Sequence, residues 1–120
     1  MSVIASVAVF LLAALHVYIM ALEMFFWTKP PGLRAFALEK GFALQTKSMA
    51  ANQGLYNGFL AAGLVWSLLH PDAEFATQIA RFFAGCVLVA GVYGGVTANR
   101  KIFFVQALPG AVCLAAVGFA

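Results

Sequence analysis

Four apolar runs, each about as long as a bilayer-spanning helix, divide almost the whole chain. They cover residues 3–27, 49–69, 75–98 and 102–120, with short polar segments between them. About 20 apolar residues in a helix cross the ~30 Å hydrocarbon core of a membrane. Lipid offers no partner to backbone N–H and C=O groups, so such runs are helical. We expect an all-α membrane protein, one domain of residues 1–120 forming a four-helix transmembrane bundle.

Composition supports the membrane class. Hydrophobic residues make up 64% of the chain and charged residues 9%, whereas soluble proteins are roughly 45–50% apolar. The net charge of +3 is small, which does not indicate a nucleic-acid partner. The first ten residues contain no Lys or Arg, so we interpret the first run as a transmembrane helix and not as a signal peptide. Cys86 and Cys113 lie within apolar runs, and we expect them to be packing residues.

The connecting segments predict the orientation. Residues 28–48 begin with Pro30 and Pro31 after the first run and mix cations with large apolar groups, as in a segment lying on lipid headgroups. This segment and the Arg100–Lys101 turn carry most of the basic residues, which places them on the cytoplasmic side. Both termini then face the non-cytoplasmic side.

Polar side chains inside the runs gather toward the predicted cytoplasmic half. His16 and Glu23 are seven residues apart and share one helix face. Lipid cannot solvate them, so this face should point into the bundle. The outer halves are nearly all apolar, which argues against a through-pore. The candidate ligand-binding residues are His16, Glu23, Lys47, Asn52, Gln53, Tyr56, Asn57, Tyr93, Asn99, Arg100 and Gln106.

Each of these residues has a structural and a functional interpretation. In the structural interpretation, Glu23 is a buried carboxyl that is hydrogen-bonded to Asn, Gln or Tyr of another helix or paired with Lys47. In the functional interpretation, it is an acid that exchanges protons or binds a ligand. His16 is more typical of a structural hydrogen-bond donor than of a metal or haem ligand, because no second ligand is near it. Asn52, Gln53 and Asn57 either bond helices together or form the polar rim of a site for an amphiphile. Gly54 and Gly58 predict a close helix contact.

Three stretches resemble a known family. They are residues 16–30 (HVYIMALEMFFWTKP), 50–61 (AANQGLYNGFLA) and 100–109 (RKIFFVQALP). Together they resemble a family of small bacterial integral membrane proteins catalogued as a domain of unknown function. The resemblance implies the fold and a bacterial cytoplasmic (inner) membrane location, but no activity.

A fainter resemblance is to the MAPEG superfamily of membrane proteins in eicosanoid and glutathione metabolism. It rests on Asn52 with Tyr56 one turn later, and on residues 92–95 (VYGG) before a basic turn. It implies four-helix subunits that form trimers with both termini on the non-cytoplasmic side. The charged residues that hold glutathione in that superfamily are replaced here by Ser48 and Leu55.

Three functional hypotheses remain open. The first is an oligomeric protein without enzymatic activity that binds a lipid or other amphiphile. The second is a MAPEG-like enzyme acting on a lipophilic substrate, with Glu23, Tyr56 and Tyr93 as catalytic candidates. The third is a small proton-coupled exporter using Glu23 with His16. The partners expected are membrane lipids and further copies of the chain, as a trimer if it is MAPEG-like; no metal, haem or nucleic acid is expected.

Overall fold

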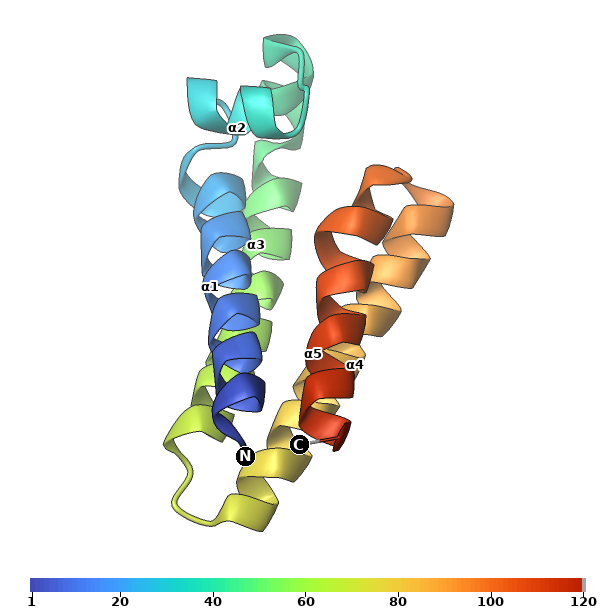
Figure 1. Ribbon diagram of the computed structural model, residues 1–120. Helices are drawn as coiled ribbons and strands as arrows, with labels where there is room; N and C mark the ends of the chain where they lie inside the picture. Colours follow the sequence, from blue (N-terminus) through green and yellow to red (C-terminus); the bar gives the residue numbers. More distant parts are fainter. Residues whose placement is uncertain (120) are drawn as a thin grey trace. The chain divides into compact units, whose positions relative to one another are not determined.

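A computed structural model describes residues 1–119, and all the regular structure in that range is helical, which confirms the all-α prediction. The elements are α1 (Val3–Phe25), α2 (Pro30–Ala35), α3 (Lys40–Leu69), α4 (Ala73–Thr97), the π-helical segment η1 (Phe103–Ala107) and α5 (Leu108–Phe119) (Figure 1).

Within that range, two helices, α1 and α4, are long and apolar enough to cross a membrane. Only 28% of the most apolar stretch of each is buried inside the protein, whereas a core helix of a soluble protein is mostly buried. Their large apolar side chains therefore face outward, as contact with lipid requires. The run Phe103–Gly118 is apolar but shorter, and α3 is long enough but carries Lys40 and Lys47.

The largest departure from the expected boundaries is at the start of the second long helix. We expected it to begin at Met49 after an irregular segment, but α3 begins at Lys40. Residues 40–48 contain no proline, and nothing in them stops a helix. Before them, α2 begins at Pro30, whose fixed φ and missing N–H suit the first helical position. The segment is therefore mostly helical.

The tertiary contacts group the chain into two compact units. Residues 15–59 form the first, which we call the α1–α3 unit. Residues 1–14 and 60–120 form the second, the α4–α5 unit. In the α1–α3 unit, the second half of α1 and the first half of α3 run side by side in opposite directions, joined through α2 (Figure 1).

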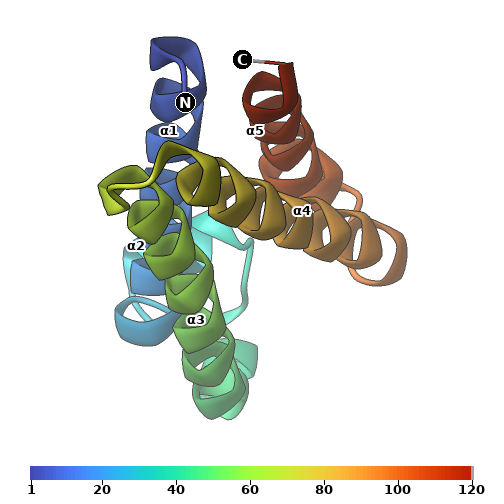
Figure 2. The same ribbon diagram turned by 90° about the horizontal axis from the view of Figure 1, so that it is seen from below.

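In the α4–α5 unit, α4 packs on η1 and α5 through a stripe of small side chains (Figure 2). Its buried residues recur every three or four positions: Ala76, Ala80, Ala84, Val87, Gly91 and Gly95. Gly91 lies against the backbone of Ala107, and Gly95 lies under the ring of Phe103. Gly91 and Gly95 therefore form a close-packing face of α4. Cys113 is buried as expected, but Cys86 is only half-buried.

Two acidic residues, Asp72 and Glu74, define the start of α4. Oδ1 of Asp72 accepts hydrogen bonds from the backbone N–H groups of Glu74 (2.9 Å) and Phe75 (3.1 Å). Asp72 therefore caps the helix, and Glu74 adds a negative charge in its first turn.

The last run is irregular near Pro109. The chain forms the π-helical segment η1 before the proline, and the N–H of Leu108 donates to the carbonyl of Phe103, five residues earlier. In an α-helix the ring of Pro109 would collide with the carbonyl of Val105. The wider π turn is a recognised way to relieve such a conflict.

Candidate functional site

Glu23 is the centre of the buried polar contacts in the α1–α3 unit. Its side chain lies on α1 and is 1% exposed. Nε2 of Gln53 donates to its Oε2 at 2.7 Å, and Nδ2 of Asn57 donates to its Oε1 at 2.5 Å. Both donors lie on α3, one helical turn apart, so the two carboxyl oxygens bridge α1 to a single face of α3. We call these three residues the Glu23 clamp.

Two glycines on α3 allow the clamp to form. A Cβ placed on Gly54 would lie 2.6 Å from Cγ of Met24 and 3.0 Å from Cβ of Glu23. A Cβ on Gly58 would lie 2.8 Å from Sδ of Met20. At Gly54 a larger residue would meet Cβ of Glu23 and the Met20 backbone and push the helices apart, whereas at Gly58 the flexible Met20 side chain can move aside. The predicted contact at Gly54 and Gly58 is therefore present.

The clamp is fully bonded. Both oxygens of Glu23 accept a hydrogen bond, and among the described residues no buried side-chain nitrogen or oxygen is without a partner. In a dry interior such bonds are stronger than in water, and an unpaired group would be costly. Chemically, the arrangement fixes the register of α1 against α3.

His16 shares the interior face of α1 with Glu23. Its side chain is 0% exposed, so both polar residues of the predicted stripe are buried. The expectation that this face of the first helix points inward is confirmed.

Asn52 and Tyr56 do not belong to the clamp, although the sequence groups them with Gln53 and Asn57. Successive residues on a helix differ by about 100°, and Asn52 and Tyr56 lie on an exposed face of α3. Tyr56 is 61% exposed, and its ring packs edge-on against Phe59 at 5.7 Å. α3 therefore has two polar faces, one bonded to Glu23 and one open.

Lys47 is also exposed, and it lies five residues before Asn52 on α3. The sequence allowed an ion pair between Lys47 and Glu23. In the structure the amides of Gln53 and Asn57 take both carboxyl oxygens instead. The reason is position, since Lys47 lies six residues, or about 9 Å, before Gln53 along α3.

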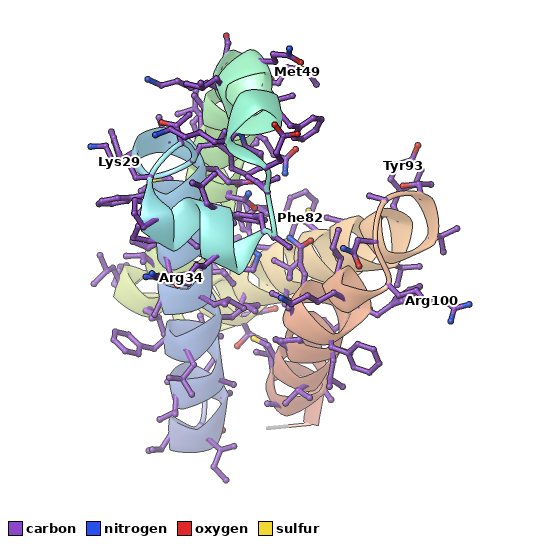
Figure 3. All side chains as sticks on the ribbon, turned by 90° about the horizontal axis from the view of Figure 1, so that it is seen from above. Lys29, Arg34, Met49, Phe82, Tyr93 and Arg100 are labelled. Atoms are coloured by element: carbon purple, nitrogen blue, oxygen red, sulfur yellow. The ribbon has the colours of Figure 1, made fainter. Side chains whose placement is uncertain are left out.

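Four further candidates belong to the α4–α5 unit: Tyr93, Asn99, Arg100 and Gln106. Tyr93 is 71% exposed at the end of α4. Oδ1 of Asn99 accepts from the backbone N–H of Lys101 at 2.9 Å, so Asn99 shapes the turn that carries the exposed Arg100 (Figure 3). The convergence of these four residues with Glu23 stays a prediction.

The sequence did not reveal how the connection between α1 and α3 is held. Nε1 of Trp27 donates to Oγ1 of Thr46 at 3.0 Å, and that hydroxyl donates to the carbonyl of Phe42 at 2.8 Å. The Trp27 and Phe36 rings lie 4.9 Å apart. Trp27 and Thr46 are nineteen residues apart and follow no motif. Only the helical extension of α3 to Lys40 places Thr46 within reach.

This connection presents a basic surface. Its four cations are all exposed: Lys29, Arg34, Lys40 and Lys47. Figure 3 shows Lys29 and Arg34 projecting outward from it. Nζ of Lys29 also lies 5.8 Å from the centre of the Phe26 ring.

Comparison with known proteins places this architecture in a family. The family model described as "Protein of unknown function (DUF1304)" matches residues 10–118. The chain belongs to this family. The match covers the Glu23 clamp, the connection and both units, and it confirms the resemblance to a family of unknown function.

A relative is known from a lactic acid bacterium. The "Uncharacterized protein YpaA" of Lactococcus lactis subsp. lactis (strain IL1403) is 28% identical over 108 residues, which cover 88% of this chain and 89% of the relative. No solved structure matches the chain. These comparisons assign no activity, and the resemblance to the MAPEG superfamily stays a prediction.

Proposed function

We propose that this chain is an integral protein of the bacterial inner membrane. Four helices would cross the bilayer, copies of the chain would assemble, and the polar residues near the cytoplasmic boundary would bind the head of a lipid or similar amphiphile. Support for the membrane part comes from α1 and α4, whose exposed side chains are mostly apolar, with Arg81 as an exposed charge within α4.

One observation carries the binding part, namely the open polar face of α3. Gln53 and Asn57 are used by Glu23, whereas Asn52 and Tyr56 point outward. An amide without a hydrogen-bond partner in an apolar medium costs about 1–3 kcal/mol by protein mutational data. In a bilayer this face therefore needs a polar partner, and a lipid head supplies one.

The length of α3 places that face at a suitable depth. Its 30 residues rise about 45 Å, of which hydrocarbon spans ~30 Å. If Leu69 lies at one boundary, the other falls about 20 residues earlier, near Met49. Lys47 then lies among headgroups, with Asn52 and Tyr56 within about two turns below them. A lipid head at the boundary can reach Asn52 and Tyr56, which share one face of α3, whereas Lys47 lies about 140–180° around the helix from them.

Removing the open face tests the proposal. The full chain is purified in mild detergent, and bound lipids are counted by native mass spectrometry, which also gives the number of copies. We expect the Asn52→Leu, Tyr56→Phe double variant to bind lipid about thirtyfold more weakly, because two hydrogen bonds of ~1 kcal/mol each are lost. Phe59→Leu, an apolar change on the same face, is the control. A wild-type protein that is monomeric and free of lipid would overturn the proposal.

The other two hypotheses make different demands on the same residues. A MAPEG-like enzyme needs accessible hydroxyls, and both Tyr56 and Tyr93 are exposed. An exporter needs Glu23 to leave its two amide partners during transport. Turnover with thiol cofactors would favour the enzyme. Flux into proteoliposomes that Glu23→Gln abolishes would favour the exporter.

A further inference from the structure

A second lipid-facing feature lies on α4, within the α4–α5 unit. An open hollow of about 700 Å³ runs along this helix from Arg81 to Tyr93, over Phe82, Gly85, Val89 and Ala90. It lies on the side of α4 away from α5, where Tyr93 projects in Figure 3. Its surface is almost entirely apolar.

The shape of this hollow comes from alternating large and small residues. Phe82, Val89 and Tyr93 stand out from the helix, being 65%, 69% and 71% exposed. Between them, a Cβ built on Gly85 would meet nothing within 4 Å, and Ala90 adds only a methyl group. The result is a shallow apolar groove between protruding side chains, of the kind that an extended hydrocarbon chain can fill.

Arg81 supplies a charge at one end of the groove. It is exposed and lies eight residues, or about 12 Å, inside α4. The nearest acidic residue before it on the helix is Glu74, about 10 Å away along the axis. Side chains on a helix point toward its N-terminus, so the guanidinium reaches toward the boundary next to the α3–α4 turn. A cation at this depth needs an anion beside it.

The groove is slightly longer than one leaflet is thick. Arg81 and Tyr93 are twelve residues apart, which corresponds to about 18 Å along the helix. Half of a hydrocarbon core of ~30 Å is about 15 Å. Because Arg81 already lies inside α4, a lipid of the leaflet next to the α3–α4 turn would place one acyl chain along the part of the groove nearest Arg81, as far as Gly85 near the middle of the helix.

A second copy of the chain does not offer the matching charge. The chain has four acidic residues. Glu23 is bonded to two amides, Glu39 lies in the α2–α3 connection, and Asp72 caps α4. If two copies are inserted in the same orientation, Glu74 of one copy lies about 10 Å from Arg81 of the other along the membrane normal. A symmetric α4–α4 contact would bring the two Arg81 side chains together.

From this geometry we propose that α4 binds an anionic phospholipid of the leaflet next to the α3–α4 turn. Its phosphate lies on Arg81, and one acyl chain lies in the groove over Gly85, beside Phe82. The site lies on a different helix and at the opposite boundary from the open face of α3, so it goes beyond the function proposed above.

The test compares an anionic with a zwitterionic lipid on the full chain. The purified protein is titrated with phosphatidylglycerol or with phosphatidylcholine of the same chain length, and bound lipids are counted by native mass spectrometry. We expect Arg81→Gln to weaken phosphatidylglycerol binding about fivefold, the effect of one cation at an anionic membrane surface, and to leave phosphatidylcholine unchanged. Lys101→Gln removes the same charge elsewhere in the unit and serves as the control.

Filling the groove tests the position of the acyl chain independently of the charge on Arg81. Gly85→Leu should weaken the binding of both lipids at this site, because the chain of either one occupies the groove. The proposal is overturned if Arg81→Gln and Lys101→Gln weaken phosphatidylglycerol binding equally, or if Gly85→Leu changes neither lipid. It is also overturned if Gly85→Leu lowers the number of copies per complex, because the groove would then hold a second copy. Asn52→Leu leaves this site unchanged, so failure here is separable from failure of the proposed function.

Discussion

Glu23 sets the register of two helices with one carboxyl group. Its two oxygens take one amide each from Gln53 and Asn57, and its side chain is almost completely buried. Sliding α3 by one turn would leave one amide and one oxygen without a partner. Because Glu23 and Asn57 are buried, the native register is favoured over its neighbours.

Truncating this carboxyl should destabilise the protein more than any substitution in the connecting segments. We expect Glu23→Ala to lower the free energy of unfolding by about 2 kcal/mol or more, because two amides lose their acceptor. Glu23→Gln should cost less than half as much, because one oxygen remains and a neighbouring amide can turn to accept from the new NH₂ group. Unfolding by SDS in mixed micelles measures both. Equal stability of Glu23→Ala and wild type would contradict this role.

Ala37 occupies a backbone conformation better suited to glycine. Its φ is 53°, in the left-handed region. The N–H of Ala37 donates to the carbonyl of Arg34, and that of Leu38 to the carbonyl of Leu33. These are the two bonds of a Schellman motif at the end of α2, where glycine is usual.

Glycine at this position should therefore stabilise the protein. We expect Ala37→Gly to raise the free energy of unfolding by about 1 kcal/mol, because a non-glycine residue in this region costs roughly 1–2 kcal/mol. Ala35→Gly, two residues earlier inside α2, should have the opposite sign. The same SDS titration compares them. A loss of stability in Ala37→Gly would show that the strain is absent.

The α4 element uses its glycines for two purposes. Gly91 lies on the buried stripe against the backbone of Ala107, and Gly85 lies over open space on the other face. The first permits close packing of α4 with η1, and the second opens the groove next to Arg81.

A matched pair of substitutions separates these roles. We expect Gly91→Ala to lower stability by about 1–3 kcal/mol, because its Cβ would overlap the backbone of Ala107, which cannot move aside. Gly85→Ala should be neutral or slightly stabilising, since its Cβ meets nothing and alanine favours the helix. Thermal melting in detergent gives both values. Similar melting temperatures for the two variants would contradict the close packing of Gly91 against Ala107 in η1.

For the whole molecule, the proposed topology places the α1–α3 connection in the cytoplasm and the α3–α4 turn outside. In a variant without Cys86 and Cys113, single cysteines are placed at Lys40 and at Asp72. We expect a membrane-impermeant maleimide to label Asp72→Cys in intact spheroplasts and Lys40→Cys only after lysis. The basic excess in the connection is the physical reason. The reverse pattern would overturn the orientation.

The sequence was sufficient for the features that depend on local chemistry. The period and length of the apolar runs predicted helices, because the backbone must bond within each segment. An Asp before an apolar run is a typical N-cap, and α4 follows Asp72 in this way. His16 and Glu23 are seven residues apart and therefore share a helix face, and polar groups at that depth face inward. The boundary at Lys40 was missed because residues 28–48 were interpreted as a connecting segment on lipid headgroups, although such a segment can be helical.

Contacts between distant residues were decided only by the tertiary structure. Asn52, Gln53, Tyr56 and Asn57 lie in one short polar stretch, and their spacing does not say which of them meet Glu23. The rotation of α3 about its axis decides this, and the close contact at Gly54 fixes that rotation. The contact of Trp27 with Thr46 likewise depends on how the chain turns through α2. Helical periodicity defines the faces of a helix, but only packing against a neighbour determines which face is buried.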